Sequence, residues 1–155
     1  MADDKKLAKA GIIFNTLCGK LDEMKVTYEI HEEDLVVTFV AKGNDLPMKF
    51  VLNIDAKREL IRLLSLIPAK FGGEKKVEGA IATNQVNFKL ADGSFDFDYE
   101  TGLIMFRMTS SYVDSLISGE LFGYMVTIAL LTVDEYNDKF LLLSRGMMKL
   151  EDFFK

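Results

Sequence analysis

The stretch DGSFDFDYETGLIMFRM, residues 92–108, indicates the fold more firmly than any other part of the chain. It contains two turn signals, Asp92-Gly93 and Thr101-Gly102. Between the turns aromatic residues alternate with acidic ones, namely Phe95, Phe97 and Tyr99 with Asp96, Asp98 and Glu100. A period of two is typical of a strand with one buried face. The stretch therefore predicts an antiparallel hairpin with strands near 94–99 and 103–109, in which the three aromatic residues are more buried than the three acidic ones.

The first third of the chain repeats this pattern. Apolar and polar residues alternate near 26–32 and 48–54, and the segment near 35–41 is rich in β-branched residues. Only a few residues separate these segments, whereas parallel pairing would need a long crossover connection. The pattern predicts an antiparallel meander of three strands.

The remaining segments have helical spacing. Residues 5–24, 74–90 and 118–144 carry apolar residues three and four apart, and 150–154 could add one last turn. Asp55 as an N-cap and Pro68 as a terminator frame a short helix over residues 60–67. We therefore expect one α+β domain over 1–155, with helices packed on a five-stranded antiparallel sheet in the order α-β-β-β-α-α-β-β-α.

The composition excludes several classes of partner and compartment. The chain has 155 residues and a net charge of −5 at pH 7, so nucleic acid and anionic membrane surfaces would be repelled. Its single cysteine, Cys18, cannot form an internal disulfide, which favours a reducing compartment. No targeting segment is visible, and the longest uncharged stretch, residues 121–133, is too short to span a bilayer. The expected location is the cytoplasm.

The sequence carries no recognisable catalytic or cofactor-binding motif. The single His31 has no cysteine or second histidine with which to form a zinc site. The acidic series from Asp92 to Glu100 has Gly93 at its second position, whereas an EF-hand loop needs glycine at the sixth. We expect no metal and no cofactor, and we do not expect an enzyme.

Two asparagines in the predicted helix 74–90 are unusual. Asn84 and Asn87 lie three residues apart, hence on one side of the helix, and asparagine is costly to bury without hydrogen-bond partners. Either their amides bond the adjoining loop or hairpin, or they contact a ligand or partner. Together with Arg107 they form the candidate polar pair or pocket of this chain.

The long helix offers a candidate interaction face. Its stripe of Phe122, Val126, Ala129 and Val133 is assigned to the core. The neighbouring apolar residues make the arc wider than the roughly 100° that one core contact needs. The candidate face consists of Leu121, Tyr124, Met125 and Ile128. Either another helix of the same chain covers it, or it binds a second copy or a client protein.

Three stretches resemble the signature of the YbjN family of bacterial proteins. They are NQVN at residues 84–87, GSFDFD at 93–98 and TGLIMFR at 101–107. The resemblance implies a fold similar to type III secretion chaperones, and a role as a sensory transduction regulator. The family has no recognised catalytic residues to carry over to this chain.

Two functions of different classes follow. The first is a non-enzymatic regulatory or chaperone-like protein that acts through protein contacts, with a protein partner or a homodimer. The alternative is a sensor domain that responds to a small molecule bound in a pocket near Asn84, Asn87 and Arg107.

Overall fold

The computed structural model describes residues 2–155, so that only residue 1 lies outside it. In this part of the chain six strands form one antiparallel sheet in the order β1-β2-β3-β4-β6-β5. The strands are β1 (Tyr28–His31), β2 (Val36–Lys42), β3 (Pro47–Asp55), β4 (Leu60–Lys70), β5 (Ser94–Asp98) and β6 (Leu103–Ser111). The helices are α1 (Ala2–Glu23), α2 (Lys75–Lys89), α3 (Gly119–Ser144) and α4 (Leu150–Phe153). The α+β class and the antiparallel sheet are confirmed.

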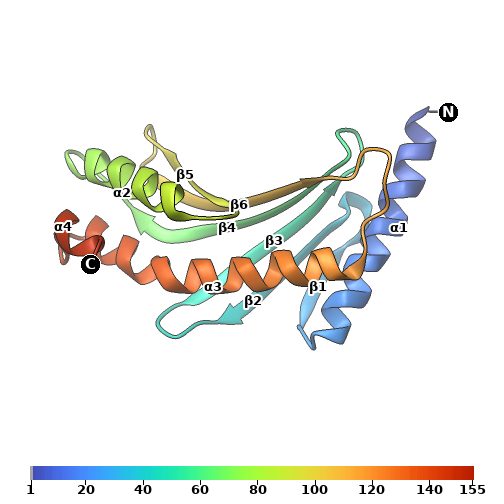
Figure 1. Cartoon of the computed structure of the whole chain (residues 1–155), viewed down its shortest axis with the longest axis horizontal. Coiled ribbons are helices and arrows are strands. Elements are labelled where there is room, and N and C mark those ends of the chain that lie inside the picture. Colours follow the sequence, from blue (N-terminus) through green and yellow to red (C-terminus); the bar gives the residue numbers. More distant parts are fainter. Residues whose placement is uncertain (1) are drawn as a thin grey trace.

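The helices divide between the two ends of the sheet. Figure 1 shows α3 running along the length of the sheet, with α1 beside β1 at one end and α2 with α4 at the other. The three long helices lie within a few residues of their predicted bounds, and Gly146, with φ of 71°, ends α3 as expected. Ser118 precedes α3, but its side chain makes no capping hydrogen bond.

The predicted short helix over residues 60–67 is wrong, because this segment is the central strand β4. It pairs with β3 on one side and β6 on the other, which makes the sheet six-stranded rather than five-stranded. Leucines occupy both faces, so the apolar pattern alone fits a helix as well as a central strand. Burial separates the faces with a period of two: Ile61, Leu63, Ser65, Ile67 and Ala69 are buried.

The residues taken for helix boundaries have other roles. The carboxylate of Asp55 accepts a hydrogen bond from the backbone N–H of Arg58 at 3.0 Å, so it stabilises the β3–β4 turn. Pro68 lies inside β4, where the register with β6 shifts between Leu66 and Lys70. Proline lacks a backbone donor, and a bulge is one of the few places where a sheet accepts it.

The hairpin of β5 and β6 forms where it is predicted, but the burial of its aromatic residues is only partly as expected. Phe95 is 1% exposed, and its ring contacts Phe106 and Phe140. Phe97 and Asp96 are both half-buried. Tyr99 is 58% exposed, because β5 has ended at Asp98 and Tyr99 lies in the turn. The aromatic residues are therefore clearly more buried than the acidic ones only at Phe95, and the predicted separation fails for Phe97 and Tyr99.

Candidate interaction surfaces

One edge of the sheet, at β5, is closed by a side chain of α2. The amide oxygen of Asn87 accepts a hydrogen bond from the N–H of Phe95 at 2.7 Å, and its nitrogen donates to the Phe95 carbonyl at 2.9 Å. The two bonds replace those that another strand would make with Phe95. Asn87 thereby satisfies backbone groups that would otherwise form an open edge.

The helix α2 packs on this edge through residues no larger than valine. Its buried residues are Gly79, Ala82, Thr83 and Val86. A Cβ atom added at Gly79 would lie 2.8 Å from the Phe97 ring and 2.9 Å from the Phe71 ring. The two rings thus occupy the space that larger side chains on this side of α2 would need.

As a consequence, the two largest apolar residues of α2, Ile81 and Phe88, point to solvent, and Val77 lies on the same side. Phe88 is 88% exposed, and Val77 and Ile81 are 51% and 42% exposed. With Asn84 they follow the spacing of four, three and four residues that is typical of a helix–helix contact. We call Val77, Ile81, Asn84 and Phe88 the α2 outer face. Exposed apolar groups gathered in this way are typical of interaction sites.

The structure brings together only part of the predicted polar pocket. Asn84 and Asn87 line a surface hollow with Gln85 and Phe88, and Arg107 is not among its lining residues. The guanidinium of Arg107 instead pairs with Asp96, with an Nε–Oδ2 distance of 2.6 Å. The hydrogen bond to this carboxylate raises the pKa of Arg107. Asn87 thus has a structural role at the hairpin, while Asn84 is exposed on α2.

The four residues of the predicted α3 face have different environments. Met125 is 2% exposed and belongs to the core, so its place in an exposed face was wrong. The apolar arc is wide because α3 is buried on more than one side. Tyr124 is 48% exposed, and Leu121 and Ile128 are half-buried. The hydroxyl of Tyr124 bonds the carboxylate of Asp92 after α2, which raises the pKa of Tyr124.

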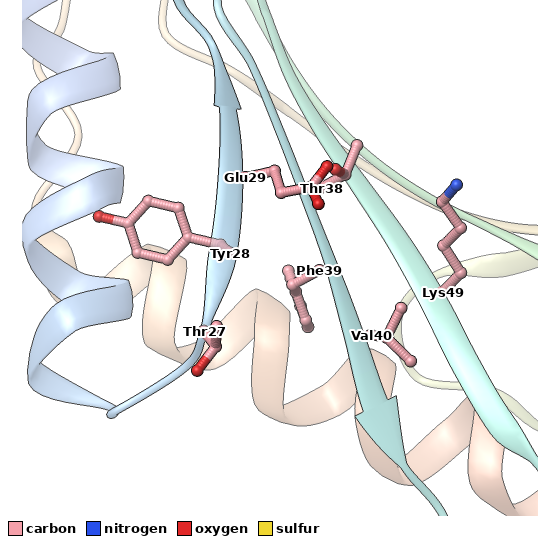
Figure 2. A pocket seen from close by; sticks show the side chains of 7 residues that line it. All are labelled: Thr27, Tyr28, Glu29, Thr38, Phe39, Val40 and Lys49. Atoms are coloured by element: carbon pink, nitrogen blue, oxygen red, sulfur yellow. The ribbon is translucent and has the colours of Figure 1, made fainter.

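The opposite edge, at β1, holds a hollow that we call the β1–β2 fork. Strand β2 continues to Lys42, whereas β1 begins at Tyr28, opposite Phe39. Figure 2 shows the hollow between these strands. Tyr28 is directed toward α1, and Lys49 lies on β3, the next strand of the sheet. Its lining residues are Thr27, Tyr28, Glu29, Thr38, Phe39, Val40 and Lys49.

The beginning of β1 is attached to α1 by one side chain. The Tyr28 hydroxyl donates to the Asp22 carboxylate at 2.9 Å, and this hydrogen bond is the main reason that the pKa of Tyr28 rises to about 12. Burial is the main cause of the raised pKa of the nearby Cys18 thiol. A thiol with a raised pKa carries little thiolate at neutral pH, and Cys18 packs partly buried against the core, so its role is packing.

The acidic side chains of β5 and its turn are engaged in local contacts rather than in a metal site. Within residues 2–155 no group of three or more His, Cys, Asp and Glu side chains could hold a metal ion. The acidic series is used locally, because Asp96 pairs with Arg107 and Asp98 accepts hydrogen bonds from Thr101 and the backbone of Glu100. No helix in the same residues is long and apolar enough to cross a membrane.

Solved structures with a similar fold include chaperone complexes. A chain in the HopA1–SchA chaperone–effector complex covers 86% of this chain and 97% of its own length, at 12% identity and a TM-score of 0.60. A chain in the ExsC–ExsE complex aligns with 83% of this chain and over 92% of its own length, at 17% identity and a TM-score of 0.56. These likenesses confirm the secretion chaperone-like fold.

The family is shown by the sequence. Residues 15–142 match the model of the YbjN family, whose description is "Putative bacterial sensory transduction regulator", and the chain belongs to this family. The solved structure of YbjN from E. coli, described as "a putative transcription regulator", is 10% identical, covers 86% of this chain and 92% of its own, and has a TM-score of 0.55. No curated protein matches the sequence.

The α2 outer face is the main feature that sequence reasoning missed. The signal was present, because Val77, Ile81 and Phe88 share one side of the helix and no residue larger than valine occupies the other. Hydrophobicity favours the larger residues as the buried side. Only the positions of the Phe71 and Phe97 rings reverse that choice.

Proposed function

We propose that this protein is a non-enzymatic bacterial regulator that acts in the cytoplasm by binding another protein. The α2 outer face is the observation that carries the proposal. Phe88 is almost fully exposed and lies beside two half-exposed aliphatic residues. A partner that covers this surface would be stabilised by roughly 25 cal/mol for each Å² of apolar area removed from water. The family and the chaperone–effector complexes among the similar folds support the same class of function.

The proposed occupant of the α2 outer face is an amphipathic helix of a partner protein. The residues follow helix-contact spacing, and Asn84 in their midst would fix the register of the pair. One face of a 15-residue helix offers less than the roughly 800 Å² per partner of a stable interface. The area fits a transient regulatory contact better than a permanent dimer.

Site-specific photo-crosslinking tests this assignment. A benzophenone amino acid at position 81, incubated with native cell lysate, should crosslink a protein of another sequence, identified by mass spectrometry. The matched control is position 147, because Met147 is also exposed and apolar but lies outside the face. Phe88→Asp in the position-81 protein should abolish the product. Equal products at both positions, or a product unaffected by Phe88→Asp, would refute the assignment.

Sedimentation velocity of the purified protein separates the two possible occupants. If the purified protein is a monomer, the result agrees with a helix of a partner protein as the occupant of the α2 outer face. A dimer that Phe88→Asp dissociates would show that a second copy occupies the face instead.

The α3 residues Leu121, Tyr124 and Ile128 remain a second proposed contact, for a partner or a homodimer. Tyr124→Lys tests it, since lysine can keep an interaction with Asp92 while removing the aromatic ring. A dimer that persists in this variant and in Phe88→Asp would exclude both faces.

A further inference from the structure

A hollow between α2, α3 and α4 gathers lysines in an otherwise acidic protein. Figure 1 shows α2, α4 and the C-terminal end of α3 together at one end of the molecule. One wall carries Gln85 and Lys89 of α2, and the other carries Glu135 and Lys139 of α3. The two residues of each pair are four positions apart, so their side chains lie on the same side of their helix. Lys155 is the third lysine at the hollow, and the remaining lining residues are Val86, Tyr136, Phe153 and Phe154.

The charges of these side chains leave an excess of positive charge. The lining residues include three lysines and one glutamate, whereas the whole chain carries −5. Lys155 pairs with Asp152 at 2.6 Å. Within residues 2–155 neither Lys89 nor Lys139 forms an ion pair with a carboxylate. Two of the three ammonium groups are therefore available to a ligand.

Lys139 forms no ion pair within residues 2–155, although a carboxylate, that of Glu135, lies one helical turn before it. Glu135 precedes it by four residues, the favoured order for an ion pair on a helix. The Lys139 ammonium lies instead 5.6 Å from the centre of the Tyr136 ring. Glu135 interacts with the Tyr136 hydroxyl, and burial is the main cause of the raised pKa of that tyrosine. Tyr136 stays protonated at neutral pH and can donate a hydrogen bond.

We propose that this hollow binds a small molecule with at least two negative charges, either a phosphate ester or a dicarboxylate. Lys89 and Lys139 on facing helices would each neutralise one charge, and Gln85 would donate a hydrogen bond. A local concentration of positive charge attracts small anions even when the overall charge is negative. The proposal is independent of the partner contact on the α2 outer face.

Ligand-induced changes in melting temperature, followed by calorimetric titration, test the proposal at constant ionic strength. The probes are inorganic phosphate, pyrophosphate, citrate and adenosine monophosphate, with adenosine as the uncharged control. At least one anion should raise the melting temperature saturably, while adenosine should not. The comparison of citrate with the phosphates identifies the source of the charge. An absence of saturable stabilisation by all four anions would overturn the proposal.

Two double variants show where the anion binds. Lys89→Gln with Lys139→Gln should weaken binding at least tenfold. Lys42→Gln with Lys49→Gln, which removes the same charge from β2 and β3, should change it less than twofold. Equal losses in both variants would mean that the anion responds only to overall charge, and the site would be rejected. Circular dichroism confirms that each variant is folded.

Discussion

The two edges of the sheet are finished by different means. At β5, helix α2 covers the strand and the Asn87 amide occupies the hydrogen-bonding groups of Phe95. At β1, the strand is only four residues long, and it carries the exposed Glu29 and is followed by the acidic turn of Glu32–Asp34. Shortness and charge are known protections for an edge that nothing covers.

The comparison shows which protection requires tertiary structure. Charge at β1 acts through residues that are adjacent in sequence. Covering β5 requires α2, the rings of Phe71 and Phe97, and the helix α3 behind Phe95 to be in place together. Stability should therefore depend strongly on the contacts at β5 and weakly on those at β1. The following variants test this difference.

The largest effect is expected from Phe95→Ala. The ring of Phe95 contacts Phe106, Tyr136 and Phe140, so its removal should lower the free energy of unfolding by about 3–5 kcal/mol. Ile30→Ala on the exposed β1 should cost less than about 1 kcal/mol. Urea denaturation measures both values. Equal losses would contradict the difference between the edges.

A methyl group at Gly79 should also destabilise the covered edge. Gly79→Ala forces the Phe71 and Phe97 rings to move, and we expect a loss of about 1–3 kcal/mol despite the better helix propensity of alanine. The matched control is Gly19→Ala in α1, where no atom lies within 4 Å of the added Cβ. This control should gain up to about 1 kcal/mol. Stabilisation by both changes would mean that α2 is not closely packed on β5.

Removal of the amide that closes β5 should have a smaller effect. Asn87→Ala breaks both hydrogen bonds to Phe95, so we expect a loss of about 1–2 kcal/mol in urea denaturation, and faster aggregation from the uncovered strand. Asn84→Ala, in the same helix but exposed, should lie within about 0.5 kcal/mol of the wild type. If the two variants behave alike, Asn87 does not protect the edge.

The smallest effect is expected at the attachment of β1. Tyr28→Phe removes the hydrogen bond to Asp22 and should cost less than about 1 kcal/mol at neutral pH. The folded pKa of about 12 lies above the ordinary value of 10.0, so the bond stabilises fully below pH 10 and its contribution is lost as the pH rises through 12. The difference in the free energy of unfolding between the wild type and Tyr28→Phe should therefore shrink between pH 10 and pH 12.

An absorbance titration of the tyrosines provides the independent measurement. Burial also raises the pKa of Tyr112 to about 12, so the Tyr28→Phe variant should lose one tyrosine titration near pH 12 and keep that of Tyr112. An unchanged titration near pH 12 in Tyr28→Phe would show that the Asp22 hydrogen bond is absent in solution.

Local patterns predicted most of the fold, and the error at residues 60–67 has a clear cause. Alternation and turn residues predicted the meander and the β5–β6 hairpin. A strand with one solvent-exposed face alternates apolar and polar residues, and this pattern is visible in the sequence. Residues 60–67 became a strand rather than a helix because β4 is central in the sheet. Its leucines on the face opposite the helices obscure the period, and only pairing with β3 and β6 resolves it.

The candidate surfaces were less predictable than the fold. The sequence indicated that α3 has an apolar excess, but Met125 proved to be buried while Tyr124 remained exposed. It grouped Arg107 with the two asparagines, although Arg107 pairs with Asp96 across the hairpin. The lysine hollow joins residues of three helices, which no spacing along the chain could bring together.

The sequence by itself determined the antiparallel strands, the long helices, the acidic charge and the family resemblance, since each is written in neighbouring residues. The tertiary structure alone decided which side of α2 faces inward. The hydrophobic effect favours burial of Val77, Ile81 and Phe88, but the rings of Phe71 and Phe97 fill the space beside Gly79, and α2 buries Gly79, Ala82, Thr83 and Val86 instead. Close packing between distant segments overrides local hydrophobicity there, and it leaves exposed the face through which we propose this protein binds its partner.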